Sequence, residues 1–432
     1  MELPKILIVT RGVWKDSEGT SSTLTNFFKG YDSKKIAQIY IETKQPQTQC
    51  CSRFFQISEY SLIRRIFRPR TQTGFDFVAD GTFETNQDVA TKEDKTMNWV
   101  RKHRSIVLWW LRELLWGFNG WQSQELKAFI KDFDPDIIWM DGSPLILMNR
   151  LHKFVKKVSG KPNTFFLMDD VYSYSKTWNP LTLLYENRRR RIVRQNVAAS
   201  DLVFVASPKM KEEYDRVFGI DSVFIAKGAD FDNIKPLDTI RHTGTKLVYL
   251  GQVYCGRIYT LISLVDILRK KNAEGADFHL SIYTNNYIPP KLLEKVQVQG
   301  VSEVLDVVPY SEVGRVMENN DILLFVETFE QKFRYLARLS FSTKIVDYLS
   351  SGKCIFAIGP SDIAPIQYFK NNRVAFVAEK EAQIGEELNL MRNESNRQEM
   401  ANASFDFAKR NHDINELHRW LYQLFVNLTK KN

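Results

Sequence analysis

The sequence is poor in the features that mark disulfide scaffolds and membrane-spanning chains. Only 4 of its 432 residues are cysteine, two of them adjacent at Cys50 and Cys51, and no CxxC pair is present. This usage indicates neither a disulfide framework nor a zinc site and fits a reducing compartment. No apolar run reaches the ~18–20 residues that cross a bilayer, because the nearest, 106–118, is broken by Arg112 and Glu113. No signal-peptide pattern opens the chain, so we expect a cytoplasmic protein.

Positive charge is what the chain has in surplus. It holds 60 Lys and Arg against 51 Asp and Glu, a net charge of +9, and its 44% hydrophobic content is typical of a folded protein. Length alone predicts roughly two to three domains. The charge by itself allows nucleic acid, a membrane surface or an anionic substrate as partner. Because no nucleic-acid-binding module is recognisable and the basic residues are dispersed, we do not expect nucleic acid.

Two series of short strand-like runs, separated by segments of helical period, divide the chain. The first series is 5–10, 37–43, 136–141, 164–169, 202–207 and 223–228. The second series is 246–251, 278–283, 304–309, 321–327, 354–359 and 374–379. Strands that alternate with helices predict βαβ units around a parallel sheet. We therefore predict an α/β fold with two Rossmann-like domains facing a central cleft, where ligands sit at the carboxyl ends of the strands.

The polar stretch 229–245 predicts a hinge between the two series. The predicted domains are 1–235 and 236–410, followed by a segment 411–432 that carries an amphipathic helix with an apolar stripe. Residues 50–98 show little pattern and are predicted to form an irregular insertion with short elements.

The strongest chemical signal lies in residues 339–360. Ser342 or Thr343 can cap a helix on which Lys344 and Asp347 share one exposed face. Free N–H groups and an ammonium at such a helix start favour a diphosphate, and Asp347 can accept hydrogen bonds from sugar hydroxyls. The alternative is an ordinary capped helix with a surface Lys344/Asp347 pair of little energetic value.

This segment resembles the two-domain glycosyltransferases of GT-B architecture, most of all family 4 of the nucleotide-sugar transferases. That family carries Pro/Ser-x-Lys-x-x-Glu-Tyr-x-x-x-Gly-x-Pro, and residues 342–354 match it closely. Asp347 stands where the family has a Glu that binds the nucleotide ribose. The resemblance implies that Ser342, Thr343, Lys344 and Asp347 bind the donor. It also implies that the second domain binds the nucleotide sugar while the first lies on the acceptor side.

Further family motifs follow in order over nearly the whole chain. The family's Gly-Arg-x-x-x-x-Lys reads Gly251 to Arg257 here, with Arg257 at the Lys position and Gln252 replacing the Arg. One of the two cations that hold the donor diphosphate is thus kept. Glu327 and Glu330 lie where another family acid contacts the donor sugar, although their spacing to the 342–354 motif departs from the family's. The alternative for Arg257 is a solvated residue at a helix start.

In the first domain, Gly19 and Thr20 stand where the family has a glycine-rich loop that approaches phosphate and acceptor. The family's double glycine is absent, and a tight turn explains a lone glycine equally well. Asp169 and Asp170 follow the strand 164–169 at a place where members often carry an acid/base residue. Adjacent carboxylates point in different directions, so at most one serves the site, and we prefer Asp170. A loop carboxylate that caps the next element is the alternative.

No metal or cofactor is expected. Asp132-Phe133-Asp134 and Asp230-Phe231-Asp232 spell DxD, a metal motif of a different transferase fold, but both lie at strand or linker entries. The six histidines show no paired ligand spacing. The nucleotide sugar is then a co-substrate and the only small molecule that the motifs require.

Two features bear on the acceptor. The aromatic segment 106–116 suits a membrane interface, but apolar residues on nearly every face suit a buried helix too, which we favour. Arginines at 64, 65, 68, 70, 188–191 and 194 can face anionic lipid, each contributing ~1 kcal/mol, although solvated helix faces explain such runs more often.

The resemblance implies a retaining transferase that moves a sugar from a nucleotide-diphosphate donor to a glycan or lipid-linked acceptor in cell-surface polysaccharide synthesis. It would work in the cytoplasm or peripherally on the inner face of the plasma membrane. One alternative is a non-catalytic sugar-nucleotide-binding or partner subunit, motivated by Gln252 and Asp347. Another is a nucleotide-sugar epimerase, whose additional acid/base pattern is not found.

Overall fold

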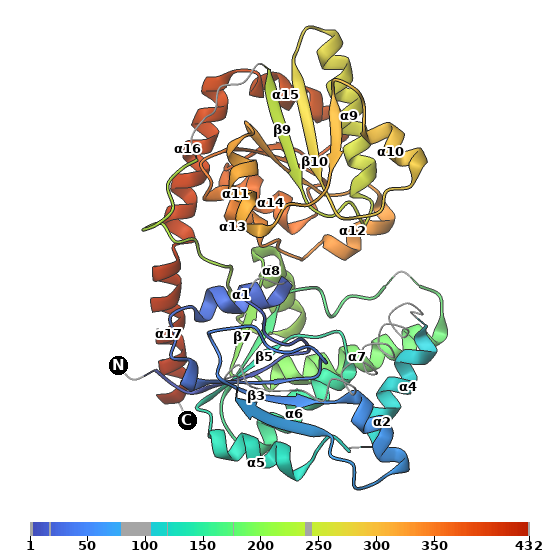
Figure 1. Ribbon diagram of the computed structural model, residues 1–432, viewed down its shortest axis with the longest axis vertical. Coiled ribbons are helices and arrows are strands. Elements are labelled where there is room, and N and C mark those ends of the chain that lie inside the picture. Colours follow the sequence, from blue (N-terminus) through green and yellow to red (C-terminus); the bar gives the residue numbers. More distant parts are fainter. Residues whose placement is uncertain are drawn as a thin grey trace. The chain divides into compact units, whose positions relative to one another are not determined.

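The computed structural model describes residues 3–16, 19–78, 105–118, 120–175, 177–237 and 244–430 (Figure 1). The chain forms two compact units. Unit 1 comprises Met1–Ala206, Lys211–Ile225 and His418–Asn432, and unit 2 comprises Ser207–Met210 and Ala226–Leu417. The change between them at Ile225 and Ala226 comes earlier in the chain than the predicted boundary at 235. Of the predicted hinge 229–245, residues 238–243 lie outside the described ranges.

Unit 1 is built on an eight-stranded sheet in the order β4-β3-β2-β1-β5-β6-β7-β8. Its strands are β1 (Ile6–Val9), β2 (Ile36–Tyr40), β3 (Arg53–Ile57), β4 (Gly74–Val78), β5 (Ile137–Asp141), β6 (Asn163–Leu167), β7 (Leu202–Val205) and β8 (Val223–Phe224). All neighbours are parallel except β3 and β4. Its central strands are buried along their length, because helices cover a parallel sheet on both faces.

The helices of unit 1 occupy the connections between these strands. They are α1 (Gly19–Phe28), η1 (Ser33–Lys35), α2 (Glu59–Phe67), α4 (Ile106–Gly117), α5 (Gln124–Phe133), α6 (Ile146–Ser159), α7 (Pro180–Ala198) and most of α8 (Pro208–Phe218). No helix in the described ranges combines the length and the hydropathy that crossing a membrane requires.

The insertion predicted at 50–98 contains short elements as expected, but two of them, β3 and β4, are strands of the sheet. Both strands join the sheet, and Phe54 of β3 stacks on Phe77 of β4 with ring centroids 5.6 Å apart. Each strand has only five residues; β4 lies at the edge of the sheet, and β3 pairs with β2 and β4. Their extended conformation comes from pairing with a neighbour, which local periodicity does not reveal. The part of the insertion at 79–98 lies outside the described residues.

Unit 2 contains a six-stranded, fully parallel sheet in the order β11-β10-β9-β12-β13-β14. Its strands are β9 (Thr245–Leu250), β10 (Phe278–Tyr283), β11 (Ser302–Leu305), β12 (Ile322–Val326), β13 (Cys354–Ile358) and β14 (Phe376–Ala378). Its helices are α9 (Arg257–Ala273), α10 (Pro290–Val296), α11 (Tyr310–Glu318), α12 (Gln331–Ala337), α13 (Lys344–Leu349), α14 (Ala364–Asn372), η2 (Glu381–Gln383), α15 (Ile384–Met391) and α16 (Glu394–Asn411). The predicted α/β class with two Rossmann-like domains is confirmed.

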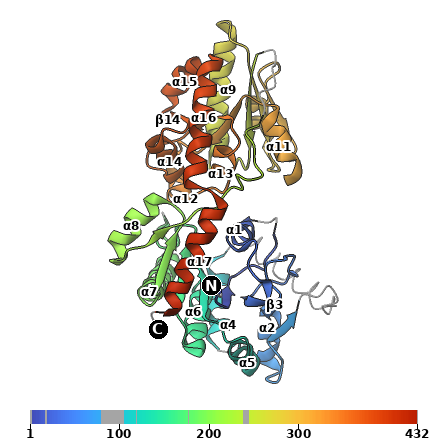
Figure 2. The ribbon, with the colours of Figure 1, turned by 90° about the vertical axis from the view of Figure 1, so that its left-hand side faces the viewer.

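The C-terminal helices bind to different units (Figure 2). α16 packs against β13 and α15 of unit 2. The last helix, α17 (Ile414–Lys430), begins in unit 2 and ends in unit 1, where Phe425 stacks on Phe28 of α1. The same Phe425 ring meets Trp139 of β5 edge-on. Leu421 and Phe425 are fully buried, so the predicted amphipathic helix is confirmed and its apolar stripe serves the core of unit 1.

Candidate functional site

The winding of the unit 2 sheet reverses between β9 and β12, its two central strands. β9 is followed along the chain by its neighbour β10, whereas β12 leads outward to β13 and β14. In open α/β sheets, ligands bind outside the carboxyl ends of the strands at such a reversal. β9 ends at Leu250 and β12 ends at Val326, so the loop that follows Leu250 and the residue Glu327 stand at this position.

Two glycines shape the loop after β9. Gly251 allows the ammonium of Lys344 to come close, since a Cβ there would lie 2.7 Å from Lys344 Nζ. Gly256 is the N-cap of α9 with φ +82° in the left-handed region, and a Cβ there would lie 2.5 Å from both Phe333 and Thr328. Only glycine fits both the backbone angle and the space at position 256. The loop therefore delivers Arg257 to the first position of α9.

Arg257 forms a two-pronged ion pair with Glu327. Its Nε lies 3.0 Å from Glu327 Oε2 and its Nη2 lies 2.8 Å from Oε1. Glu327 is only 4% exposed, and its burial raises the pKa of that carboxyl group against the opposing charge of Arg257. Two of the five guanidinium N–H groups are thus used to orient the cation. A fixed guanidinium at the carboxyl edge of the sheet suits a phosphate oxygen.

Lys344 lies at the same edge and comes from α13. Its ammonium donates a hydrogen bond to the backbone oxygen of Leu250, the last residue of β9. Burial and then the charge of Arg257 lower the pKa of Lys344 to about 8, although Asp347 and Glu327 oppose the shift. Two cations therefore share one confined place, an arrangement that an anionic ligand relieves. Of the predicted donor residues, the structure brings Arg257, Glu327 and Lys344 together.

Asp347 has a partner that sequence reasoning missed. Its Oδ1 accepts a hydrogen bond from the ammonium of Lys227, in the loop that follows β8. The segment 226–231 was recognised only as a landmark of the linker, and the lysine itself is the signal that was available. The Asp347 side chain stays 32% exposed, so hydroxyl groups of a ligand still reach the carboxylate.

The helix that carries Lys344 and Asp347, α13, is not capped by Thr343. α13 begins at Lys344 and ends at Leu349, and Thr343 makes no side-chain cap hydrogen bond. A cap residue needs an extended backbone, whereas Thr343 is already helical with φ −58° and ψ −25°. Ser342 Oγ accepts a long hydrogen bond of 3.4 Å from the N–H of Lys344. The start of α13 therefore lacks the side-chain cap that the sequence suggested at Thr343.

Gln252 and Glu330 lie at the margin of this cluster. Gln252 is exposed, and its backbone oxygen accepts a 2.6 Å hydrogen bond from the Tyr249 hydroxyl. Glu330 is exposed, precedes α12, and donates its N–H to Thr328 Oγ1. Glu327, rather than Glu330, is therefore the acid that contacts Arg257.

The two aspartates after β6 have different environments. Asp170 Oδ1 accepts hydrogen bonds from the N–H groups of Tyr172 and Ser173, at 3.1 and 2.9 Å. The Tyr214 hydroxyl adds a third, at 2.8 Å. Burial opposes them, but these hydrogen bonds hold the pKa of Asp170 below its usual range. Asp170 is therefore a weak base at neutral pH and fits the loop-capping alternative, whereas Asp169 is exposed.

The remaining predicted residues are placed as follows. Gly19 and Thr20 form the first turn of α1, and their side-chain surroundings lie outside the described part of the structure. Asp132 pairs with Arg53 at 2.6 Å, and Asp134 pairs with Lys161 at 3.2 Å. Within the described ranges, no three His, Cys, Asp or Glu side chains gather as metal ligands would. That no metal is needed stays a prediction.

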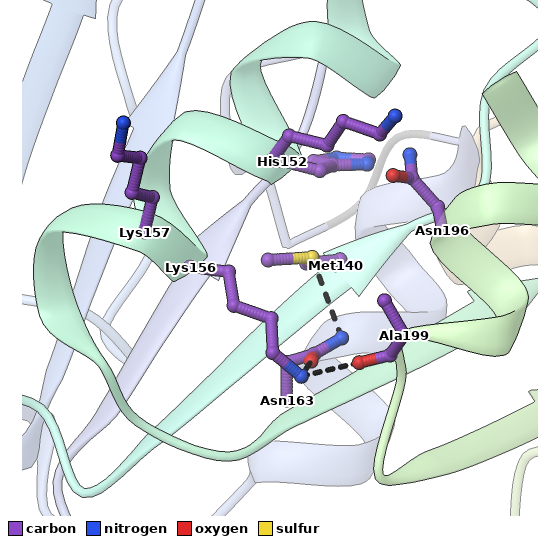
Figure 3. Close-up of a pocket in the computed structure, with 8 residues that line it drawn as sticks. Met140, His152, Lys156, Lys157, Asn163, Asn196 and Ala199 are labelled. Carbon is purple, nitrogen blue, oxygen red and sulfur yellow. Dashed lines mark hydrogen bonds between the residues drawn. The ribbon is translucent and has the colours of Figure 1, made fainter.

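A cavity of about 220 Å³ lies in unit 1 where β6 begins, between α6 and α7 (Figure 3). It is lined by Met140, His152, Lys153, Lys156, Lys157, Asn163, Asn196 and Ala199. Because the strands are parallel, this is the amino edge of the sheet, opposite to the edge where ligands of such folds bind. Burial lowers the pKa of His152 to about 3, so the imidazole is neutral. None of the predicted site residues lines this cavity.

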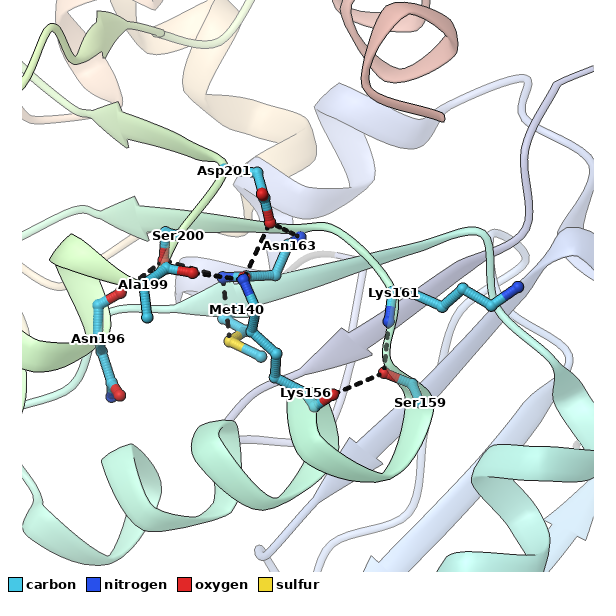
Figure 4. A network of polar contacts seen from close by, with 9 residues as sticks. All are labelled: Met140, Lys156, Ser159, Lys161, Asn163, Asn196, Ala199, Ser200 and Asp201. Carbon is cyan, nitrogen blue, oxygen red and sulfur yellow. Dashed lines mark hydrogen bonds and ion pairs between the residues drawn. The ribbon is translucent and has the colours of Figure 1, made fainter. Parts of the chain in front are cut away.

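Lys156 lines that cavity, and its ammonium links several backbone segments through hydrogen bonds (Figure 4). Its ammonium donates to Asn163 Oδ1 and to the backbone oxygen of Ala199. It also lies 3.0 Å from Asp201 Oδ2, which in turn accepts the N–H of Asn163 at 2.9 Å. One ammonium thereby joins α6 to the end of α7 and the start of β6. This network accounts for all three ammonium donors.

Replacement of this lysine tests the structural role. We expect Lys156→Met to lower the free energy of unfolding by about 1–3 kcal/mol, because its acceptors lose their donor. The adjacent, exposed Lys157→Met is the matched control and should change stability little. Urea unfolding checks both. Equal effects of the two variants would show that the network contributes nothing specific.

Solved structures that resemble this chain over nearly its whole length share one fold. The sequence matches no protein-family model, and no curated protein matches it. A glycosyltransferase structure from Rickettsia africae is similar, with TM-score 0.62, 11% identity and 100% of both chains covered. Anabaena HepE in complex with UDP-glucose has TM-score 0.62 and 9% identity, covering 98% of this chain and 100% of that chain.

A trehalose-6-phosphate structure from E. coli, bound with UDP-2-fluoro glucose, has TM-score 0.56 and 9% identity and covers 98% of each chain. At such identities the likeness shows the fold. The chain has the GT-B fold of these structures, and the finer resemblance to family 4 stays a prediction.

Proposed function

We propose that this protein is a glycosyltransferase that binds a nucleotide-diphosphate sugar at the carboxyl edge of the unit 2 sheet. The observation that carries the proposal is the pair of confined cations, Arg257 and Lys344, at the point where the sheet winding reverses. Glu327 orients the first cation and a strand-end carbonyl orients the second. The fold agrees with this reading. Because HepE was solved with UDP-glucose, a uridine diphosphate sugar is the first donor to test.

The chemistry follows from where charge develops. In the transfer, the bond between the anomeric carbon and the diphosphate oxygen breaks, and a bond to the acceptor hydroxyl oxygen forms. Negative charge then grows on the leaving diphosphate, where Arg257 and Lys344 stabilise it without a metal ion. Asp347 would accept hydrogen bonds from the ribose. The acceptor's proton leaves to the departing phosphate or to a carboxylate, for which exposed Asp169 suits better than Asp170. Retention at the anomeric carbon is part of this proposal.

We place the acceptor among glycans and lipid-linked glycans of cell-surface polysaccharide synthesis. The surplus of positive charge supports this choice, since both a glycosyl diphosphate lipid and an anionic membrane attract cations. On this proposal the protein works on the inner face of the plasma membrane and associates with it peripherally.

Nucleotide titration of the purified protein tests the donor site. UDP should bind at least about tenfold more tightly than UMP, since the two cations meet the additional phosphate. Calorimetry measures both dissociation constants. If no nucleoside diphosphate binds, the protein is a partner subunit with a degenerate site, a reading that exposed Gln252 would then support.

A second measurement addresses catalysis. With UDP-sugars and no acceptor, slow release of UDP and free sugar is expected, and the sugar that is hydrolysed fastest identifies the donor. If a sugar isomer still attached to UDP accumulates instead, the protein is an epimerase.

A further inference from the structure

Three helices of unit 1 form one layer beside the sheet. α4 contacts both α2 and α7 and lies between them (Figure 1). Glu59 of α2 accepts two hydrogen bonds from Arg112 of α4, at 2.7 and 2.8 Å. The indole N–H of Trp110 reaches the backbone oxygen of Leu181 in α7 at 3.3 Å. These ties hold the three helices as one surface.

The outward face of this layer is apolar. Val107, Leu111 and Leu114 of α4 and Phe118 directly after it are all exposed and recur at helical spacing. Glu113 and Trp116 of the same helix are buried. The prediction of a buried helix at 106–116 is therefore right for one face and wrong for the other, because α4 has apolar residues on both.

Exposed apolar side chains also occur on and beside the two neighbouring helices. Phe67 at the end of α2 is 80% exposed, and Trp178, just before α7, is 97% exposed. Leu181 and Leu184 on α7 are exposed as well. A fully exposed Trp with a row of exposed leucines beside it is uncommon on a water-facing surface and marks an interaction site.

The charges on this layer have one sign at the surface. The acidic residues of α2, α4 and α7 are Glu59, Glu113 and Glu186, and all three are buried. The exposed charged residues of these helices are arginines: Arg64 on α2 and Arg188, Arg191 and Arg194 on α7, with Arg68 directly after α2. The acidic side chains of these helices are therefore buried, and the charge that they expose to solvent is positive.

Leucines and arginines on α7 lie on one stripe. Leu181, Leu184, Arg188 and Arg191 recur at intervals of three and four residues, so they share one side of the helix. The four arginines at 188–191 do not all face solvent: Arg188 and Arg191 are exposed, whereas the two between them are engaged with the protein. Arg189 is buried and donates to Ser173, and Arg190 covers the ring of Tyr172 at 3.8 Å.

We propose that the outward face of α2, α4 and α7 docks the protein on an anionic lipid bilayer. Leu111, Leu114 and Trp178 enter the interface between headgroups and acyl chains, and Arg188 and Arg191 meet the lipid phosphates. This deepens the proposed function, since it rests on an acceptor held at a membrane. Charge favours lipid over a second copy of this chain, because two copies would bring like charges together.

Vesicle sedimentation of the full chain tests the surface. We expect binding to phosphatidylcholine vesicles that contain phosphatidylglycerol, and little binding to phosphatidylcholine alone. Arg188→Gln/Arg191→Gln should weaken the partition about thirtyfold. Leu111→Ser/Leu114→Ser should weaken it about tenfold or more, because apolar area no longer leaves water. Salt should lower the binding of the parent protein and affect the arginine variant less.

Matched controls come from unit 2. Lys291→Gln/Arg315→Gln removes two exposed cations, and Tyr287→Ser/Tyr310→Ser removes two exposed aromatic rings. Both should leave sedimentation unchanged. Equal loss in controls and test variants would overturn the proposal. So would unchanged vesicle binding in the test variants, or a lighter oligomer in Leu111→Ser/Leu114→Ser, which would identify a second copy as the occupant.

UDP titration of the same proteins separates this inference from the proposed function. Unchanged UDP affinity in the surface variants is expected, because none of their residues lies in unit 2. A parent protein that sediments with vesicles but does not bind UDP would overturn the donor site and leave the docking surface standing. The reverse result would overturn the surface alone.

Discussion

Lys344→Met should weaken UDP binding by about 10- to 100-fold, which corresponds to the about 1.5–3 kcal/mol of a charged hydrogen bond. The ammonium donates to the backbone oxygen at the end of β9 and lies within the electrostatic influence of Arg257, so its loss removes one of the two confined cations. UDP affinity measured by calorimetry checks the effect. Lys353→Met is the control for general damage, because it removes a buried ammonium that donates a hydrogen bond to the backbone oxygen of Glu318.

The pH dependence of UDP binding provides a sharper form of this test. The pKa of Lys344 is lowered to about 8, so the ammonium is charged below that pH and lost above it. If only the charged form binds, the affinity falls about tenfold between pH 7 and pH 9. Lys344→Arg, whose guanidinium stays charged, should remove that fall.

The free energy of unfolding of the ligand-free protein should rise with pH, opposite to the UDP affinity. The unfolded chain holds the Lys344 proton up to its ordinary pKa, so between pH 8 and that value the unfolded state binds more protons. This group therefore makes the ligand-free protein more stable as the pH rises, while UDP affinity falls. A pH-independent affinity in the parent protein would contradict the assignment of Lys344 to the diphosphate.

Arg257→Leu should destabilise unit 2 by about 3–5 kcal/mol, because it leaves the carboxylate of Glu327 buried and unpaired. The matched control is Arg269→Leu on the same helix, whose ion pair with Asp266 is exposed and contributes at most about 1 kcal/mol. Urea unfolding measures both. An equal response would mean that the Arg257–Glu327 pair has no special structural role.

The double variant Arg257→Leu/Glu327→Gln distinguishes folding from binding. Removing the charge of Glu327 should restore much of the lost stability, since no ion is then left unpaired. UDP affinity should stay low, because the cation that meets the diphosphate is still missing. A stable double variant that binds UDP as the parent does would exclude Arg257 from the donor site.

Long, locally patterned elements were predictable from the sequence. The runs at 5–10, 136–141 and 321–327 correspond to central strands that are buried on both faces, and each consists mainly of large apolar residues. The strands β3 and β4 escaped prediction, because five residues with mixed polarity become a strand only beside a partner. Arg257, Lys344 and Asp347 were proposed as donor-site residues from the resemblance to the family's motifs.

The sequence by itself determined two Rossmann-like halves, the amphipathic helix at the C-terminus and the candidate cations, since each is encoded in neighbouring residues. Only the tertiary structure decided which charges meet. Arg257 and Glu327 lie 70 positions apart, and Lys227 and Asp347 lie 120 apart, so no local pattern pairs them. It also decided that Arg188 faces outward while Arg189 is buried. The physical reason is that burial and ion pairing depend on distant parts of the chain, whereas helix and strand periodicity depends on near ones.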